Sequence, residues 1–144
     1  MYQYSLYFFE PDYAYHFYYK VDVLYRFIKE QLHEPQTDTS KRQADHILVK
    51  PDCHLVIDQL LTEEMDKSYL ELANDQFELK NSDGNITVQQ HGYALTVFAP
   101  SLLEADAIVF EAIKRCYRYT FVVNFQTEEC GWVLPLTNRS FELN

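Results

Sequence analysis

Side chains that could do nucleophilic, acid–base or metal chemistry are few and scattered in this sequence. The five histidines stand singly, and only Cys53-His54 places a thiol beside an imidazole. Neighbouring residues on a regular element point in different directions, so this pair is a poor catalytic dyad or metal site. The acid pairs Glu63-Glu64 and Glu128-Glu129 imitate a carboxylate couple, but in an acidic chain they are typical of solvated faces and turns.

Sequence motifs of enzymes are missing as well. The chain has no G-x-S-x-G turn, P-loop, H-E-x-x-H zinc motif or dinucleotide fingerprint. We therefore predict that the protein is not an enzyme and needs no catalytic residue, metal or cofactor. A small-ligand-binding domain with a pocket that the sequence hides is an alternative.

The stretch YAYHFYY at residues 13–19 is unusually rich in rings. Steps of three and four residues in a helix over 11–33 predict one core stripe, made of Ala14, Phe17, Val21, Leu24, Ile28 and Leu32. Tyr15 and Tyr19 then lie on the opposite side, where a helix of a globular protein is normally polar. An apolar patch rimmed by polar groups marks a binding surface, and Tyr is enriched at interface hot spots.

A second interpretation divides this helix near residues 19–22. Aromatic and β-branched residues are weak helix formers, and Asp22 can cap a new helix. The break would leave Tyr13, Phe17 and Tyr18 free to form an exposed face of their own. Both interpretations fit the pattern.

Several other segments have the pattern of strands. Residues 2–9 predict a first strand, and ITVQQ-HG-YALTVFA predicts two strands around a turn at His91-Gly92. YRYTFVVNF is a further strand, followed by a turn at Gly131 and a short extended piece. Trp132, just after that turn, is interpreted as a core plug at the sheet edge.

Helices are expected between these strands. Ser101 and Glu104 form a capping box for a helix whose core face is predicted to hold Leu103, Ala107, Phe110 and Ile113. A short helix carries Ala44, Ile47 and Leu48, and residues 53–66 favour a helix over a strand. Ser68 and Glu71 predict a helix in which Tyr69, Ala73 and Phe77 share a face, although FELK equally fits a strand.

These elements predict an α/β chain of the α+β type. With 144 residues and 47% hydrophobic residues, the chain fits a single domain over 1–144. We expect two layers, a mostly antiparallel sheet with helices covering one face.

The charge limits the classes of partner. The net charge is −10 and Lys and Arg form no cluster, which argues against direct binding of nucleic acid or of an anionic membrane. The chain shows neither the pattern of a signal peptide nor that of a membrane span. Its three cysteines lack C-x-x-C spacing and are typical of small buried residues in a reducing compartment. We expect a cytoplasmic protein.

The sequence also resembles a known family. The Tyr-rich opening strand, EPDYAYHFYYKVDVLYRFI, ILVKPDCHL and DAIVFEAIKRC...FVVNFQTEECGWVLPLTNRSF are similar to SirA, the sporulation inhibitor of replication family of endospore-forming bacteria. The resemblance covers nearly the whole chain and is weakest at 62–90. Its most specific part is NF-x5-GW-x2-P.

This resemblance implies a regulator without enzymatic activity. It implies binding to the N-terminal domain of the replication initiator DnaA, which blocks new rounds of initiation without touching ATP or DNA. The partner-binding positions that it implies are Tyr13, Ala14, Phe17, Tyr18, Gln43, Ala44 and Ile47. A different interaction module, including a self-associating one, is the alternative, and the oligomeric state stays open.

Overall fold

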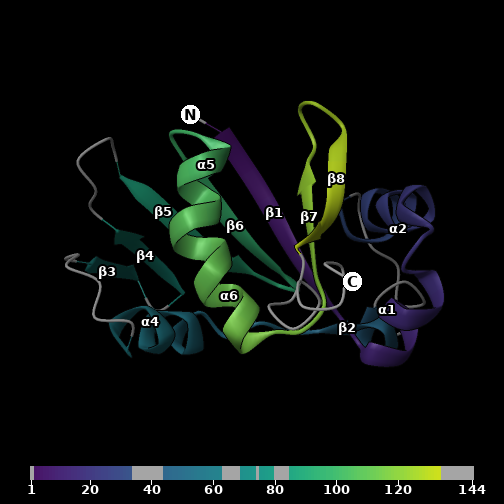
Figure 1. The fold of residues 1–144 in the computed structure, drawn as a ribbon, viewed down its shortest axis with the longest axis horizontal. Coiled ribbons are helices and arrows are strands. Elements are labelled where there is room, and N and C mark those ends of the chain that lie inside the picture. The colour runs from purple at the N-terminus through teal and green to yellow at the C-terminus, as the bar shows by residue number, and fades with distance from the viewer. Residues whose placement is uncertain (1, 34–43, 63–68, 74, 80–84, 134–144) are drawn as a thin grey trace, which may run out of the picture.

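The structure is a computed structural model, and it describes residues 2–33, 44–62, 69–73, 75–79 and 85–133. Its centre is one antiparallel sheet in the order β3-β4-β5-β6-β1-β7-β8, with β2 paired to the end of β1 (Figure 1). The strands are β1 (Tyr2–Phe9), β2 (Leu48–Val49), β3 (Tyr69–Ala73), β4 (Gln76–Leu79), β5 (Ile86–His91), β6 (Ala94–Ala99), β7 (Thr120–Asn124) and β8 (Glu129–Val133).

Helices accompany the sheet at several points of the chain. They are α1 (Pro11–Phe17), α2 (Val21–Phe27), the π-helix η1 (Ile28–His33), α4 (Cys53–Thr62), α5 (Leu102–Glu104), the π-helix η2 (Ala105–Phe110) and α6 (Glu111–Cys116). Residues 44–47 form a further helical turn. The α+β prediction is therefore confirmed. None of the helices in the described part of the chain has the length and apolarity needed to span a membrane.

The predicted first strand lies at the centre of the sheet. β1 pairs with β6 on one side and with β7 on the other, so that Leu6 lies opposite both Leu95 and Val122. Successive side chains of a strand point to opposite faces. Leu6 and Phe8 accordingly belong to one buried cluster, while the neighbouring aromatic residues of the same strand belong to another. Burial on both faces explains why the sequence of β1 is an almost unbroken aromatic and apolar run.

The two clusters lie under different helices. In the first cluster, Val56 of α4 and Ile113 of α6 pack against β1 and β4–β6, and the α5–α6 segment crosses in front of the sheet in Figure 1. In the second cluster, Leu24 of α2 and Ile28 of η1 pack with Phe121 of β7. The helices thus lie on both faces of the sheet and not on one, because β1 and β7 carry large apolar side chains on both sides.

The segment around residues 68–77 differs from its prediction. It forms two strands, β3 and β4, and the predicted capping-box helix is wrong; Ser68 itself lies outside the described residues. In β4, Phe77 and Leu79 are buried and alternate with partly exposed neighbours. Phe77 lies opposite Val88 of β5. The period of two, which buries one side of β4 against the first cluster, outweighs the local helix signal.

The adjacent helix predictions have different outcomes. The preferred helix over 53–66 is confirmed as α4, and residues 63–66 lie outside the described part of the chain. The predicted helix after Ser101 is confirmed in position as α5, η2 and α6. Its predicted face is wrong at Leu103, which is 78% exposed, although Phe110 and Ile113 are buried. A π-helical turn holds more residues than an α-helical turn, so η2 rotates Leu103 away from that face. The side chains of Glu104 and Ala107 are outside the description.

Two hairpins complete the sheet. The predicted β5–β6 hairpin is confirmed, but its turn lies at Gly92-Tyr93 and not at His91-Gly92, because His91 still pairs with Ala94. Gly92 has a φ of 59°, a left-handed conformation that favours glycine. In the last hairpin the predicted turn at Gly131 is wrong, because Gly131 lies within β8 opposite Val122. The turn comes earlier, where Asn124 Oδ1 accepts the backbone N–H of Gln126 at 3.0 Å.

Burial of β1 predicts a loss of stability in alkaline solution. Burial raises the pKa of Tyr7 from 10.0 to about 12. Below pH 10 the phenol is protonated in the folded and the unfolded chain, so its contribution is complete there. Between the two pKa values only the unfolded chain releases the proton, and the free energy of unfolding falls by about 2–3 kcal/mol.

Urea unfolding followed from about pH 8 to about pH 12 measures this loss. Tyr7→Phe lacks the titrating group and keeps the ring, so its free energy of unfolding is expected to decline less steeply. Equal slopes for the two proteins would contradict the assignment to Tyr7.

Candidate functional site

The aromatic segment after β1 folds as two short helices. α1 ends at Phe17 with Tyr18 as its C-cap, and α2 begins at Val21 with Lys20 as its N-cap. The interpretation with a break is therefore confirmed. The predicted cap is not, because Asp22 lies inside the first turn of α2, where its negative charge favours the helix dipole.

The predicted core stripe is preserved across this break. Ala14, Leu24 and Ile28 are buried in the second cluster, and Phe17 and Val21 pack against it. The side chain of Leu32 is outside the description. α1 therefore packs on the second cluster through Ala14 and part of Phe17. The other sides of this helix are exposed to solvent.

Two rings of α1 stack on each other at the surface. Tyr13 and Phe17 lie one helical turn apart, with ring centroids 6.1 Å apart and planes at 15°. Tyr13 is 39% exposed, and Phe17 is half-buried. The ammonium of Lys20 lies 5.7 Å from the centre of the Phe17 ring. Together with the half-buried Tyr18, these two rings make up what we call the α1 aromatic face.

Two further rings, one on α1 and one within the break, are almost fully exposed. Tyr15 is 84% exposed and Tyr19 is 93% exposed. This confirms the prediction that both point away from the core. Tyr19 makes an edge contact with Tyr18 at 5.3 Å between centroids, so the surplus of rings noted in the sequence is a surface feature.

The second predicted partner-binding segment lies next to the start of α1. The N–H of Glu10 donates to the carbonyl of Ile47 at 2.9 Å, and Phe9 of β1 pairs with Leu48 of β2. The structure therefore brings together two segments that are separated by a long stretch of sequence.

Some residues of these two segments have buried side chains. Ala14 and Ala44 are fully buried in the second cluster, so their side chains support the surface from below. Ile47 packs half-buried against the same cluster. Gln43 lies outside the described residues. Among the described residues of the predicted set, the accessible ones are Tyr13 and the half-buried Phe17, Tyr18 and Ile47.

Trp132 joins the end of α1 to the sheet. It lies on β8 at the edge of the sheet, where its ring meets Phe9 and Phe121 edge-on, so the predicted core plug is confirmed. Its other side stacks on Tyr18, with centroids 5.1 Å apart and planes at 9°. The Trp132 Nε1–H donates to the Tyr18 carbonyl at 2.8 Å. Sequence reasoning missed this contact, because the two residues are 114 positions apart and no local pattern links them.

A comparison with protein families shows the family of the chain. The family model of the sporulation inhibitor of replication protein SirA matches residues 2–137, which include β1, the α1 aromatic face and Trp132. The chain belongs to the SirA family. Members of the SirA family are sporulation inhibitors of replication, and SirA is not a known enzyme family. A search of curated proteins finds no match.

A hollow in the described part of the chain is lined by residues of α2, η1 and the β7–β8 hairpin. This open hollow of about 580 Å³ lies between α2–η1 and the β7–β8 hairpin, and Lys29 and Glu128 approach each other across it at 3.8 Å between Nζ and Oε1. Burial, and then the charge of Asp22, raise the pKa of the Cys130 thiol in its wall. A protonated thiol is a poor nucleophile, so the raised pKa does not favour Cys130 as a nucleophile.

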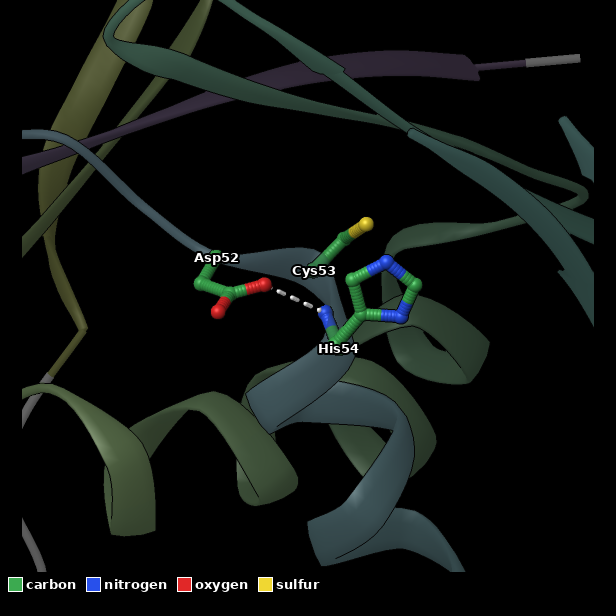
Figure 2. Close-up of side chains that lie close together, drawn as sticks. All are labelled: Asp52, Cys53 and His54. Atoms are coloured by element: carbon green, nitrogen blue, oxygen red, sulfur yellow. Dashed lines mark hydrogen bonds between the residues drawn. The ribbon is translucent and has the colours of Figure 1, made fainter. Parts of the chain in front are cut away.

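A second cluster at the start of α4 has the residue types of a metal site. Asp52, Cys53 and His54 bring a carboxylate, a thiol and an imidazole within 4.8 Å of one another (Figure 2). Asp52 Oδ1 accepts the backbone N–H of His54 at 2.9 Å, which is the bond of a helix N-cap. Cys53 is buried in the first cluster, and its N–H donates to Gln90 Oε1 at 3.0 Å. Asp52 therefore caps α4, and Cys53 is buried in the first cluster, which agrees with the prediction that this cysteine is a small core residue.

The helix-cap role of Asp52 leads to a stability prediction. Asp52→Ala removes the oxygen that accepts the His54 N–H, and we expect the free energy of unfolding to fall by about 1 kcal/mol. Asp52→Asn keeps a cap oxygen and most of this stability. Urea unfolding of the three proteins measures the difference, with and without zinc. A zinc-dependent rise in the wild-type midpoint that Asp52→Ala abolishes would favour a metal site instead.

Proposed function

We propose that this chain inhibits the initiation of chromosome replication during sporulation by binding the N-terminal domain of DnaA through the α1 aromatic face. The stacked pair Tyr13 and Phe17 carries the proposal, because it is an ordered apolar surface that remains open to a partner. Membership of the SirA family supports the part concerning sporulation and replication. The choice of DnaA rests on the family resemblance in the sequence.

The composition of the face suits a protein partner. Aromatic rings bury a large area on binding, and a pair that is already stacked has little freedom left to lose. Two exposed polar residues, His16 and Lys20, lie against the Phe17 ring, and the exposed Asp12 precedes Tyr13. Central rings with a polar surround are the usual arrangement of an interface hot spot.

The proposed inhibition requires no chemistry. A DnaA N-terminal domain that is covered by the α1 aromatic face is not available for DnaA assembly or for contacts with DnaA regulators. The net charge of −10 opposes direct competition for DNA, because a DNA-binding surface needs clustered cations. The inhibitor is therefore expected to act on the initiator protein and not on the origin.

A double substitution on this face tests the proposal. We expect Tyr13→Ala with Phe17→Ala to weaken binding to full-length DnaA by about 30-fold or more, since truncation of even one hot-spot ring costs about 2 kcal/mol. Tyr15→Ala with Tyr19→Ala removes two rings from the same region and is the matched control, with an expected change within about threefold. Calorimetric titration measures both affinities, and circular dichroism checks that each variant is folded.

Three results would contradict the proposal. They are a wild-type chain that does not bind full-length DnaA, equal binding to DnaA that lacks its N-terminal domain, and equal affinity of the Tyr13, Phe17 variant and the wild type. If the double variant unfolds, Tyr13→Ala alone provides the test, because Tyr13 is already exposed. A self-associating module would be favoured if the mass measured by sedimentation rises with protein concentration and if Tyr15→Ala with Tyr19→Ala abolishes this rise.

A further inference from the structure

α1 is too short to hold its own conformation. It has seven residues, and isolated helices below about 12–15 residues are marginal in water. Its N-cap residue, Glu10, makes no side-chain capping bond. The direction in which Tyr13 and Phe17 point must therefore be set by contacts with the rest of the fold, which are the packing of Ala14 in the second cluster and the partners at the two ends of the helix.

The N-terminal end of α1 is fixed by its connection to the sheet. Glu10 follows directly after β1, and its N–H is bonded to the Ile47 carbonyl beside β2. The Ala14 N–H donates to the Glu10 carbonyl at 3.0 Å, which closes the first turn. Pro11 at the first helical position is pre-set for a helix and needs no donor there.

The C-terminal end needs partners from outside the helix. The last carbonyls of any helix lack intrahelical donors. In α1 the Phe17 carbonyl accepts the N–H of Lys20 at 2.9 Å, which is a local turn. The next carbonyl, that of Tyr18, accepts the indole N–H of Trp132 at 2.8 Å. The far edge of the sheet thus supplies a side-chain donor to the end of this helix.

Trp132 is itself held firmly enough to serve as an anchor. It lies directly opposite Phe121 in the β7–β8 ladder, and the two rings meet edge to face at 5.2 Å between centroids. Phe9 packs against it in the same way at 5.6 Å. The indole ring is therefore wedged between the sheet and the Tyr18 ring, and any rotation of α1 would break both the stacking and the hydrogen bond.

We propose that Trp132 is a positioning residue for the α1 aromatic face. Its indole N–H and its ring fix Tyr18, and through Tyr18 they set the angle at which Tyr13 and Phe17 meet the partner. The identity of that partner rests on the proposed function, whereas the positioning of α1 does not. Trp132 acts through the helix end and is not one of the rings that the partner is proposed to bury.

Trp132→Phe is the most selective variant for this role. It keeps an aromatic ring against Tyr18 and removes only the donor and part of the ring. We expect binding to full-length DnaA to weaken about fivefold to tenfold, which is the size expected for one lost hydrogen bond and a less ordered helix. Val133→Ala is the matched control. Val133 is the next residue of β8, and its side chain packs in the first cluster on the opposite face of the sheet.

A purely structural role of Trp132 would affect the two variants alike. Both are expected to lose some stability, measured by urea unfolding, but Val133→Ala should keep its affinity within about twofold, because its side chain packs in the first cluster and α1 packs in the second. Amide hydrogen exchange over residues 11–19 gives a readout that needs no partner. We expect about tenfold faster exchange there in Trp132→Phe and no change there in Val133→Ala.

The binding and hydrogen-exchange results together distinguish a failure of the positioning role from a failure of the proposed function. If the wild type binds DnaA and Trp132→Phe binds equally well, Trp132 does not position the face, whatever its effect on stability. If the wild type does not bind DnaA, the proposed function fails and hydrogen exchange decides: faster exchange limited to α1 supports the positioning role. Unchanged exchange at α1, or an equal increase in both variants, overturns it.

Discussion

Burial of β1 on both faces is the constraint around which the molecule is arranged. The strand lies between β6 and β7, and its alternate side chains feed two separate clusters. An antiparallel sheet can normally leave one face to water, but Tyr7 and Phe9 do not permit this. A second set of helices must cover them, and α1 and α2 are that cover. The surface proposed to bind a partner is thus the outer side of a helix that the fold needs in order to cover β1.

This origin explains why so small an element can carry a binding face. α1 contributes Ala14 to the core, and its small side chain lets the helix lie close to the sheet. The larger rings of α1, Tyr13 and Phe17, then lie on the sides of the helix that do not face the sheet. The break at residues 18–20 separates α1 from α2, and Tyr19 within it is exposed to solvent. The excess negative charge offsets the tendency of such exposed rings to promote aggregation.

The sequence was informative wherever local pattern and tertiary burial agree. β1, the β5–β6 hairpin, α4 and the helix after Ser101 were predictable because apolar spacing in each matches its final environment. The segment 68–77 was not predictable. Its helix-capping signal competes with an apolar period of two, and that period becomes favourable only when β4 pairs with the distant strand β5. Leu103 was wrongly predicted to face the core, because the local spacing of apolar residues does not indicate a π-helical turn. The rings of the candidate site were found by their surplus, whereas the bond between Trp132 and Tyr18 depends on two distant segments meeting across the fold.

The position of Trp132 gives the protein an optical property of its own. It is the single tryptophan of the chain, and it lies 5.1 Å from Tyr18 and 6.4 Å from Tyr119 between ring centroids. Tyrosines at such short range pass their excitation energy to an indole, and indole emission changes colour with the polarity around it. The native fluorescence of this chain therefore reports on the junction between α1 and the sheet, so a displacement of that helix would be visible without any attached dye.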